Sequence, residues 1–397
     1  LNVKVPLETN AEKMERVILN ETSYFGYGSI SELKNILNSR GYKKVLALTD
    51  AELIKFGVFE KVENVLKVAK VKYMVFSEIQ ANPTVENVKN ALKALKKSKA
   101  DVLVAVGGGS VIDTAKAVSV IATNPDFNDV VSLDGTANTK HKGMPLIACP
   151  TTAGTAAEVT INYVITDTTR GKKMVCVDPH DIPSVAIVDA SLMETMPKGI
   201  TASTGMDALT HALECLITKG ATQLSDMFAL EAAKTIYKYL PIAVKDGKNK
   251  EAREKMAYAQ YVAGMGFSNV GLGIVHSMAH PLGGRFNIAH GLANAMILPT
   301  VLKYNMESPS LPKYRLMAQI FGVKTEGLTD EQCAKKAIAC VEKLKKEVGI
   351  PEKLSELGIT EKDLDVLSVD AYNDVCTGGN PRETSVADIK KLYKKIL

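Results

Sequence analysis

The chain has 397 residues, of which 46% are apolar and 23% are charged, and its 49 basic and 44 acidic residues leave a formal net charge of +5. This length exceeds what one hydrophobic core normally serves, so two domains are expected. A small positive charge spread along the chain argues against nucleic acid or an anionic membrane as a partner.

The cysteines and the apolar pattern indicate a protein of the cytoplasm. No C-x-x-C pair occurs, so neither a disulfide framework nor a structural zinc site is predicted. No apolar run reaches the length of a membrane span, and residues 1–10 lack the pattern of a signal peptide.

The first half of the chain alternates between strand-like and helix-like segments. Strands are expected at 43–50, 71–79, 101–106, 145–150, 161–167, 173–178 and 184–189, the fifth and sixth forming a hairpin. Helices are expected between the early strands, as at 85–98 and 111–122. This alternation is typical of a Rossmann-like parallel sheet covered by helices.

The turn at 107–110 reads Gly-Gly-Gly-Ser and separates an expected buried strand from a helix. Backbone N–H groups of such a turn can approach a phosphate, with the positive end of the helix dipole behind them. The turn matches neither G-x-G-x-x-G nor the P-loop, so a tight turn without a ligand remains an alternative.

The pattern changes after residue 189. Helix-length segments follow at 207–217, 223–240, 252–267 and 332–347, with almost no strand-like runs. We therefore expect an α/β dinucleotide-binding domain at 1–190 and an all-helical, metal-binding domain at 191–397. Sites on the two domains would face each other across a cleft.

Four of the six histidines fall within 205–213 and 275–291. Residues four apart on a helix share a face, with Cβ atoms roughly 6 Å apart, so one pair can converge in each segment. The candidate ligands are Asp207, His211, His276, His280 and His290. These are five, whereas a divalent ion usually takes three or four ligands from a protein.

A single histidine in an apolar helix usually packs in the core or caps a helix end. Two pairs of possible ligands spaced four residues apart, in a chain with few histidines, favour a metal site instead. Pro281 and the pair Gly283-Gly284 are expected to end the helix that begins near residue 275 and to turn the chain back towards His290. Imidazoles with one carboxylate suit Zn²⁺, Fe²⁺, Co²⁺ or Ni²⁺, and the ligand types do not choose among them.

Four segments together resemble the iron-activated (group III) alcohol dehydrogenases, and the match covers nearly the whole chain. They read GGGSVIDTAKA (107–117), PTTAGTAAEVT (150–160), GMDALTHALE (205–214) and SNVGLGIVHSMAHPLGGRFNIAHG (268–291). Segments 155–167, 175–194, 260–273 and 374–383 are most similar to the branch that reduces lactaldehyde.

The resemblance implies a role for each candidate residue. Asp207, His211, His276 and His290 match the metal ligands, and His280 matches a catalytic histidine near the nicotinamide and the substrate. The remaining dinucleotide positions are Asp50, Asn82, Gly108, Gly109, Ser110, Thr151, Thr152 and Lys173. The substrate pocket positions are Asn162, Phe267, Leu272 and Cys376.

The implied activity is NADH-dependent reduction of a short aldehyde, with L-lactaldehyde and L-1,2-propanediol as the best-matching pair. Asp50 would accept from a ribose 2′-OH and repel a 2′-phosphate, which favours NAD over NADP. Fe²⁺ is implied as the Lewis acid, with Zn²⁺ as the alternative.

Two other activities stay open: a broader dehydrogenase of 1,3-propanediol, butanol or ethanol, and a metal-dependent lyase related to dehydroquinate synthase. The lyase would need a pocket rich in lysine and arginine for an anionic substrate. The resemblance also implies a homodimer. Residues 2–20 are a candidate edge strand for pairing with a partner, and no other protein partner is indicated.

Overall fold

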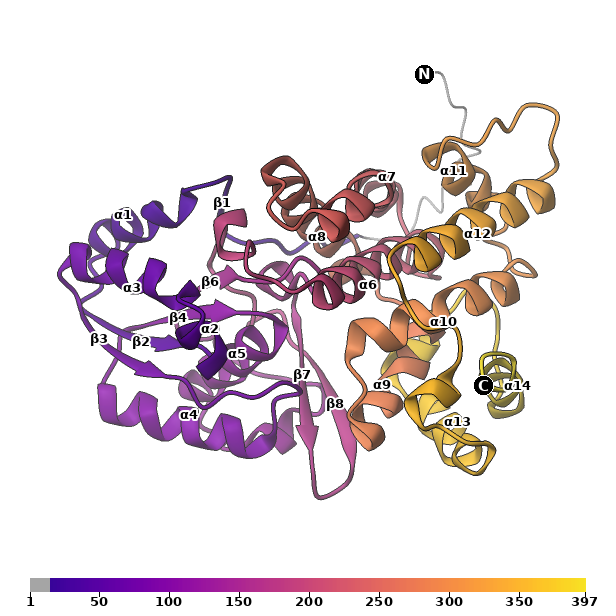
Figure 1. The fold of residues 1–397 in the computed structure, drawn as a ribbon. Helices are drawn as coiled ribbons and strands as arrows, with labels where there is room; N and C mark the ends of the chain where they lie inside the picture. The colour runs from indigo at the N-terminus through magenta and orange to yellow at the C-terminus, as the bar shows by residue number, and fades with distance from the viewer. Residues whose placement is uncertain (1–14) are drawn as a thin grey trace.

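A computed structural model describes residues 15–397 of the chain (Figure 1). Six parallel strands form its main sheet, in the order β1-β9-β6-β4-β2-β3. The strands are β1 (Thr22–Phe25), β2 (Lys44–Leu48), β3 (Lys72–Phe76), β4 (Val102–Gly107), β6 (Leu146–Pro150) and β9 (Val185–Val188). The helices between them are α1 (Glu32–Ser39), α2 (Ala51–Lys55), α3 (Val58–Ala69), α4 (Val85–Ser98) and α5 (Gly109–Thr123).

Helices cover both faces of this sheet because its central strands are apolar on both sides. Along β4, Leu103 and Ala105 pack with the core of α4 and α5, whereas Val102 and Val104 pack with that of α1 and α3. Successive side chains of a strand point to opposite faces, so a continuous apolar run suits a doubly covered strand. The predicted Rossmann-like α/β fold of the first half is confirmed.

The expected hairpin belongs to a second, smaller sheet. Strands β7 (Asn162–Asp167) and β8 (Lys172–Val177) are antiparallel, and the short β5 (Gly135–Thr136) pairs with β8. The hairpin extends from the α/β half towards helix α9 (Ile274–Phe286), which β8 contacts (Figure 1). It thereby brings residues of the first half close to the expected metal segment.

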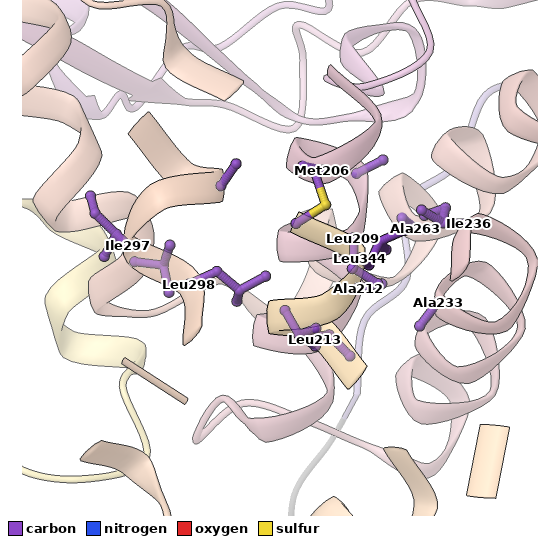
Figure 2. Close-up of a cluster of buried hydrophobic side chains, with 14 of the residues drawn as sticks. Met206, Leu209, Ala212, Leu213, Ala233, Ile236, Ala263, Ile297, Leu298 and Leu344 are labelled. Carbon is purple, nitrogen blue, oxygen red and sulfur yellow. The ribbon is translucent and has the colours of Figure 1, made fainter. Parts of the chain in front are cut away.

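The second half is helical, as predicted. Its helices are α6 (Lys198–Ile217), α7 (Gln223–Lys245), α8 (Lys250–Val270), α9, α10 (His290–Asn305), α11 (Lys313–Ile320), α12 (Asp330–Glu347), α13 (Leu364–Tyr372) and α14 (Val386–Lys395). Helix α6 is buried along most of its length and contacts α7, α8 and α10, so its apolar residues lie at the centre of the core (Figure 2).

Close packing in this core depends on glycine at particular positions. A Cβ on Gly264 of α8 would lie 2.5 Å from Ala156 Cβ and 2.4 Å from Val159 Cγ1. Neither neighbour has a flexible side chain that could move aside. By contrast, a Cβ on Gly199, in the first turn of α6, would have no atom within 4 Å, so that glycine is not required by packing.

The prediction that Pro281 and Gly283-Gly284 end a helix is wrong. Helix α9 continues through all three residues to Phe286, and the chain turns at Asn287, whose φ is 53°. The glycines instead allow the hairpin to approach: a Cβ on Gly283 would lie 2.8 Å from Lys173 Cε. The proline costs one backbone hydrogen bond, which the buried packing of the helix outweighs.

Three further expectations have different outcomes. Among residues 15–397, no helix is long and apolar enough to cross a membrane. Of the proposed partner strand at 2–20, residues 2–14 lie outside the described part, and 15–20 are not in a strand. The domain division at residue 190 stays a prediction.

Candidate active site

Four of the five candidate ligands converge at one point between α6, α9 and α10. Asp207 and His211 come from α6, His276 from α9 and His290 from the start of α10, and one ligand atom from each lies within 4.8 Å of the others. Asp207 Oδ1 is 3.7 Å from His290 Nε2 and 3.9 Å from His276 Nε2. The fifth candidate, His280, falls in a different group.

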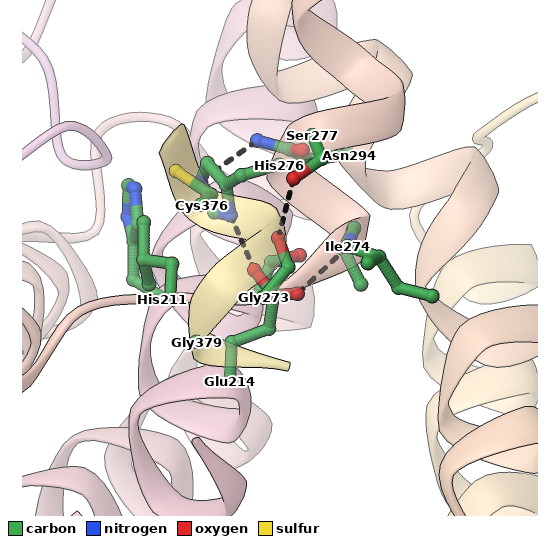
Figure 3. A network of polar contacts seen from close by, with 12 residues as sticks. His211, Glu214, Gly273, Ile274, His276, Ser277, Asn294, Cys376 and Gly379 are labelled. Carbon is green, nitrogen blue, oxygen red and sulfur yellow. Dashed lines mark hydrogen bonds and ion pairs between the residues drawn. The ribbon is translucent and has the colours of Figure 1, made fainter. Parts of the chain in front are cut away.

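Two of these imidazoles are held through their second ring nitrogen. His276 Nδ1 lies 2.5 Å from Glu214 Oε2, and His211 Nδ1 lies 3.2 Å from the carbonyl oxygen of Gly154 (Figure 3 shows the first contact). An acceptor at Nδ1 places the hydrogen there and leaves the lone pair on Nε2. Such contacts orient the ligands of metal sites and raise their basicity.

Burial keeps the cluster in the protonation state that a metal requires. Desolvation lowers the pKa of His211 and of His276 to about 4, and it lowers the pKa of His290 well below the usual value. These imidazoles are therefore neutral at pH 7. Neutral imidazole and ionised carboxylate are the forms that bind metal.

An amide at the centre of the cluster tests whether a cation fits. Asn294 Nδ2 lies 2.7 Å from Asp207 Oδ1 and 3.1 Å from Nε2 of both His276 and His290. Figure 3 shows Asn294 beside His276. Three acceptors thus face one amide group that has two hydrogens. Asn294 Oδ1 is buried and has no hydrogen-bond partner among the described residues. A divalent cation fits this set of converging lone pairs.

His280 lies beside the cluster and has a different partner. Its Nδ1 is 2.7 Å from Asp374 Oδ2, and its ring stacks with that of His290 at a centroid distance of 5.4 Å. Both His280 and Asp374 are nearly buried, with side-chain exposures of 6% and 9%.

The predicted dinucleotide residues follow the carboxyl ends of neighbouring strands. Asp50 follows β2, Gly108 and Gly109 follow β4, and Thr151 follows β6. A Cβ on Gly109 would lie 2.8 Å from Thr155 Cγ2, so glycine lets the loop after β6 pack against the start of α5. The first two residues of α5, Gly109 and Ser110, follow the carboxyl end of β4, which is the edge where α/β folds bind ligands.

One carboxylate oxygen of Asp50 accepts a hydrogen bond from the backbone. Its Oδ1 accepts from the backbone N–H of Leu53 at 2.9 Å, which caps α2. Burial raises the pKa of this carboxyl and outweighs the lowering by the backbone N–H groups of Leu53 and Glu52, so the net shift is upward.

Asn82 and Lys173 both line the cleft and are hydrogen-bonded to each other. Lys173 Nζ donates to Asn82 Oδ1 at 2.8 Å, and Asn82 Nδ2 donates to Asn287 Oδ1 at 2.6 Å. Burial lowers the pKa of Lys173 to about 8. The carboxyl edge of the sheet, the hairpin and the end of α9 are thereby joined.

One cleft contains most of the predicted residues. It is lined by Asn82, Gly109, Ser110, Asn162, Lys173, His211, Phe267, Leu272, His276, His280, His290 and Cys376, among others. Asp207 is buried below it, and Asp50, Gly108, Thr151 and Thr152 are outside its lining. The predicted substrate residues and the imidazole cluster therefore border the same space.

Comparison with known proteins identifies one family for both halves of the chain. Residues 20–190 match the family described as iron-containing alcohol dehydrogenase, and 201–397 match the C-terminal part of the Fe-containing alcohol dehydrogenase family. The chain belongs to the iron-containing alcohol dehydrogenase family.

Individual members of the family are similar along their full length. A lactaldehyde reductase of Escherichia coli (strain K12) is 48% identical over 378 residues, which cover 95% of this chain and 98% of that protein. An NAD-dependent methanol dehydrogenase of Bacillus methanolicus is 40% identical over 97% of this chain and all of that protein. The crystal structure of a 1,3-propanediol oxidoreductase superimposes with a TM-score of 0.94 at 37% identity, covering 97% of this chain and all of that one.

Sequence reasoning missed three polar residues of the site. Glu214 and Asn294 had a usable signal, because they follow His211 by three residues and His290 by four, and so share their helical faces. Asp374 had none, since it is separated from His280 by 94 residues.

Proposed function

We propose that this member of the family interconverts a short aldehyde and its alcohol with NAD(H), and that L-lactaldehyde and L-1,2-propanediol are its substrate pair. The supporting observation is the shared cleft, in which the imidazole cluster lies beside the carboxyl edge of the sheet and the pocket residues. The likeness to lactaldehyde reductase supports the choice of substrate.

The four clustered residues would hold Fe²⁺, with Zn²⁺ as the alternative. A divalent cation there supplies Lewis acidity that favours negative charge on the substrate oxygen, and a dinucleotide at the sheet edge supplies or accepts hydride. Asp207 provides the only carboxylate among the four, and the three neutral imidazoles provide the remaining donors.

The sheet edge would bind the dinucleotide. The N–H groups at Gly109 and Ser110 would face the pyrophosphate, and Thr151 and Thr152 would border it. Asp50 Oδ2 would accept from the adenosine ribose and disfavour a 2′-phosphate, so NAD is preferred to NADP. Lys173 and Asn82 would lie over the nicotinamide half.

His280 would move the proton. In aldehyde reduction its Nε2 donates a proton to the substrate oxygen as hydride reaches the carbonyl carbon, and in alcohol oxidation the same atom accepts it. Phe267 and Leu272 line the cleft beside the cluster and would exclude water. Asn162 and Cys376 would contact the substituent of the aldehyde.

A broader substrate range remains the alternative, because relatives named for methanol and 1,3-propanediol align over 97% of the chain. One or two pocket side chains, worth about 1–3 kcal/mol, are enough to change such a preference. The lyase alternative loses support, because Lys173 is the one lysine or arginine among the described residues that line the cleft.

The test is anaerobic NADH oxidation with ferrous iron, comparing L-lactaldehyde, propanal, butanal and dihydroxyacetone, with NADPH and a chelator in parallel. We expect lactaldehyde to lead, NADH to exceed NADPH, and the chelator to abolish turnover. A faster reaction with another aldehyde would move the assignment to that substrate. If the metal-loaded protein reduced no aldehyde, the proposed activity would be refuted.

We also propose that the protein is a cytoplasmic homodimer and that its two domains divide at residue 190.

A further inference from the structure

Asp374 lies just before a short 3₁₀ helix, η7 (Val375–Gly379), and both of its carboxylate oxygens have partners. Oδ1 accepts from the backbone N–H of Cys376 at 2.9 Å, which caps η7. Oδ2 faces His280 Nδ1 at 2.7 Å. Capping needs only the first of these contacts, so the second calls for a separate explanation.

The charge of Asp374 determines which nitrogen of His280 carries the hydrogen. Burial raises the pKa of Asp374, but its contact with His280 and its hydrogen bond from the backbone N–H of Cys376 lower it, and the net shift is downward. An ionised carboxylate only accepts hydrogen bonds, so the hydrogen of a neutral His280 must be on Nδ1. The lone pair is then on Nε2, for which no described residue is a hydrogen-bond partner.

We propose that Asp374 is a positioning residue of the reaction, which fixes His280 in the tautomer whose Nε2 accepts and returns the substrate proton. This inference rests on the proton-transfer role proposed above for His280. Asp374 does not touch the substrate; it acts through the imidazole, as a buried carboxylate behind a general base does in other enzymes.

The proton balance in alcohol oxidation follows from this geometry. The hydride of the alcohol's C–H bond would be taken up by NAD⁺ bound at the sheet edge, while the O–H proton passes to His280 Nε2 and the C=O bond forms. The resulting imidazolium still directs Nδ1–H at Asp374, whose negative charge stabilises it. Nε2 then returns its proton to water, and aldehyde reduction reverses each step.

The pair of His280 and Asp374 also lines a second hollow. His280 and Lys173 line the cleft and also line a second hollow at the surface, together with Asp374, Arg285 and Asp370. Arg285 and Asp370 form a half-exposed ion pair there, at 2.5 Å. The imidazole therefore lines the second hollow as well as the substrate space.

The test uses Asp374→Asn, which keeps the shape and the capping oxygen of the side chain. Its amide would donate to His280 Nδ1, so the hydrogen of the imidazole would move to Nε2 and block acceptance of the substrate proton. We expect kcat for oxidation of L-1,2-propanediol to fall about a hundredfold or more. KM, the Kd for NADH and the metal content should stay near those of the wild type.

Asp370→Asn is the matched control, because it makes the same substitution in the same hollow on a carboxylate that pairs with Arg285. Its kcat should be close to that of the wild type. His280→Ala and the double variant His280→Ala/Asp374→Asn should have equal activity, since Asp374 acts only through the imidazole. A further loss in the double variant would show a merely structural role and overturn the proposal.

A second readout does not depend on turnover. With only six histidines in the chain, ¹⁵N-histidine NMR of the zinc-loaded, diamagnetic protein can assign the tautomer of His280. The Nδ1–H form in the wild type and the Nε2–H form in Asp374→Asn support the proposal; Nε2–H in the wild type overturns it. If the wild-type protein turned over no alcohol or aldehyde, the proposed function would fail, but the tautomer would still decide the role of Asp374.

Discussion

Replacement of Glu214 by glutamine should weaken metal binding although Glu214 touches no metal. The carboxylate is 2% exposed; its Oε2 holds His276 Nδ1 at 2.5 Å, and its Oε1 accepts from the backbone N–H of Val275 at 2.8 Å. Glutamine retains an oxygen for Val275, so the start of α9 stays capped. Its amide would donate to His276 Nδ1 and shift the hydrogen to the ligating Nε2.

The expected loss is about 10- to 100-fold in metal affinity, or about 1.4–2.7 kcal/mol, as is typical when a group that orients a ligand is changed. Competition with a chromophoric chelator under anaerobic conditions measures it directly. Glu326→Gln, on an exposed carboxylate without a hydrogen-bond partner among the described residues, is the control. A metal Kd for Glu214→Gln within twofold of the wild type would refute this reasoning.

The same residue predicts a pH dependence. Burial raises the pKa of Glu214 to about 7, whereas the pKa values of His211 and His276 are lowered to about 4. Between pH 6 and 8 the imidazoles therefore stay neutral while Glu214 loses its proton. Metal affinity of the wild type should rise across this range because the carboxylate supports the Nδ1–H tautomer, and Glu214→Gln should lack that rise.

Four other substitutions test a buried charge, the packing of the helical core and a metal ligand. Burial raises the pKa of Glu158 from 4.5 to about 7, so the folded state binds more protons than the unfolded state between these pH values. The free energy of unfolding should therefore fall as the pH rises from 4.5 to 7. In urea unfolding, Glu158→Gln should remove this slope and add about 2–3 kcal/mol at pH 8. An unchanged slope would contradict it. Gly264→Ala should cost about 1–3 kcal/mol, whereas Gly199→Ala should be neutral or stabilising by up to about 1 kcal/mol; equal melting temperatures would disprove the clash. Asp207→Ala should abolish stoichiometric metal binding, and full metal content would exclude Asp207 as a ligand.

The sequence by itself determined the architecture, because the relevant signals are local. The apolar runs at 101–106 and 145–150 can be buried only as strands covered on both faces, and the longer periodic segments after residue 190 can bury one face only as helices. The spacing of Asp207 and His211, and of His276 and His280, placed each pair on one helical face before any tertiary contact was known.

Only the tertiary structure decided which groups act together. Spacing could not separate His280 from the other histidines; the crossing of α6, α9 and α10 does so, because it directs four ligand atoms to one point and His280 to Asp374. The spacing also could not show that Gly283 leaves room for the Lys173 side chain and does not end the helix. Such contacts join residues far apart in the chain, and their geometry depends on how whole helices pack, which no local pattern encodes.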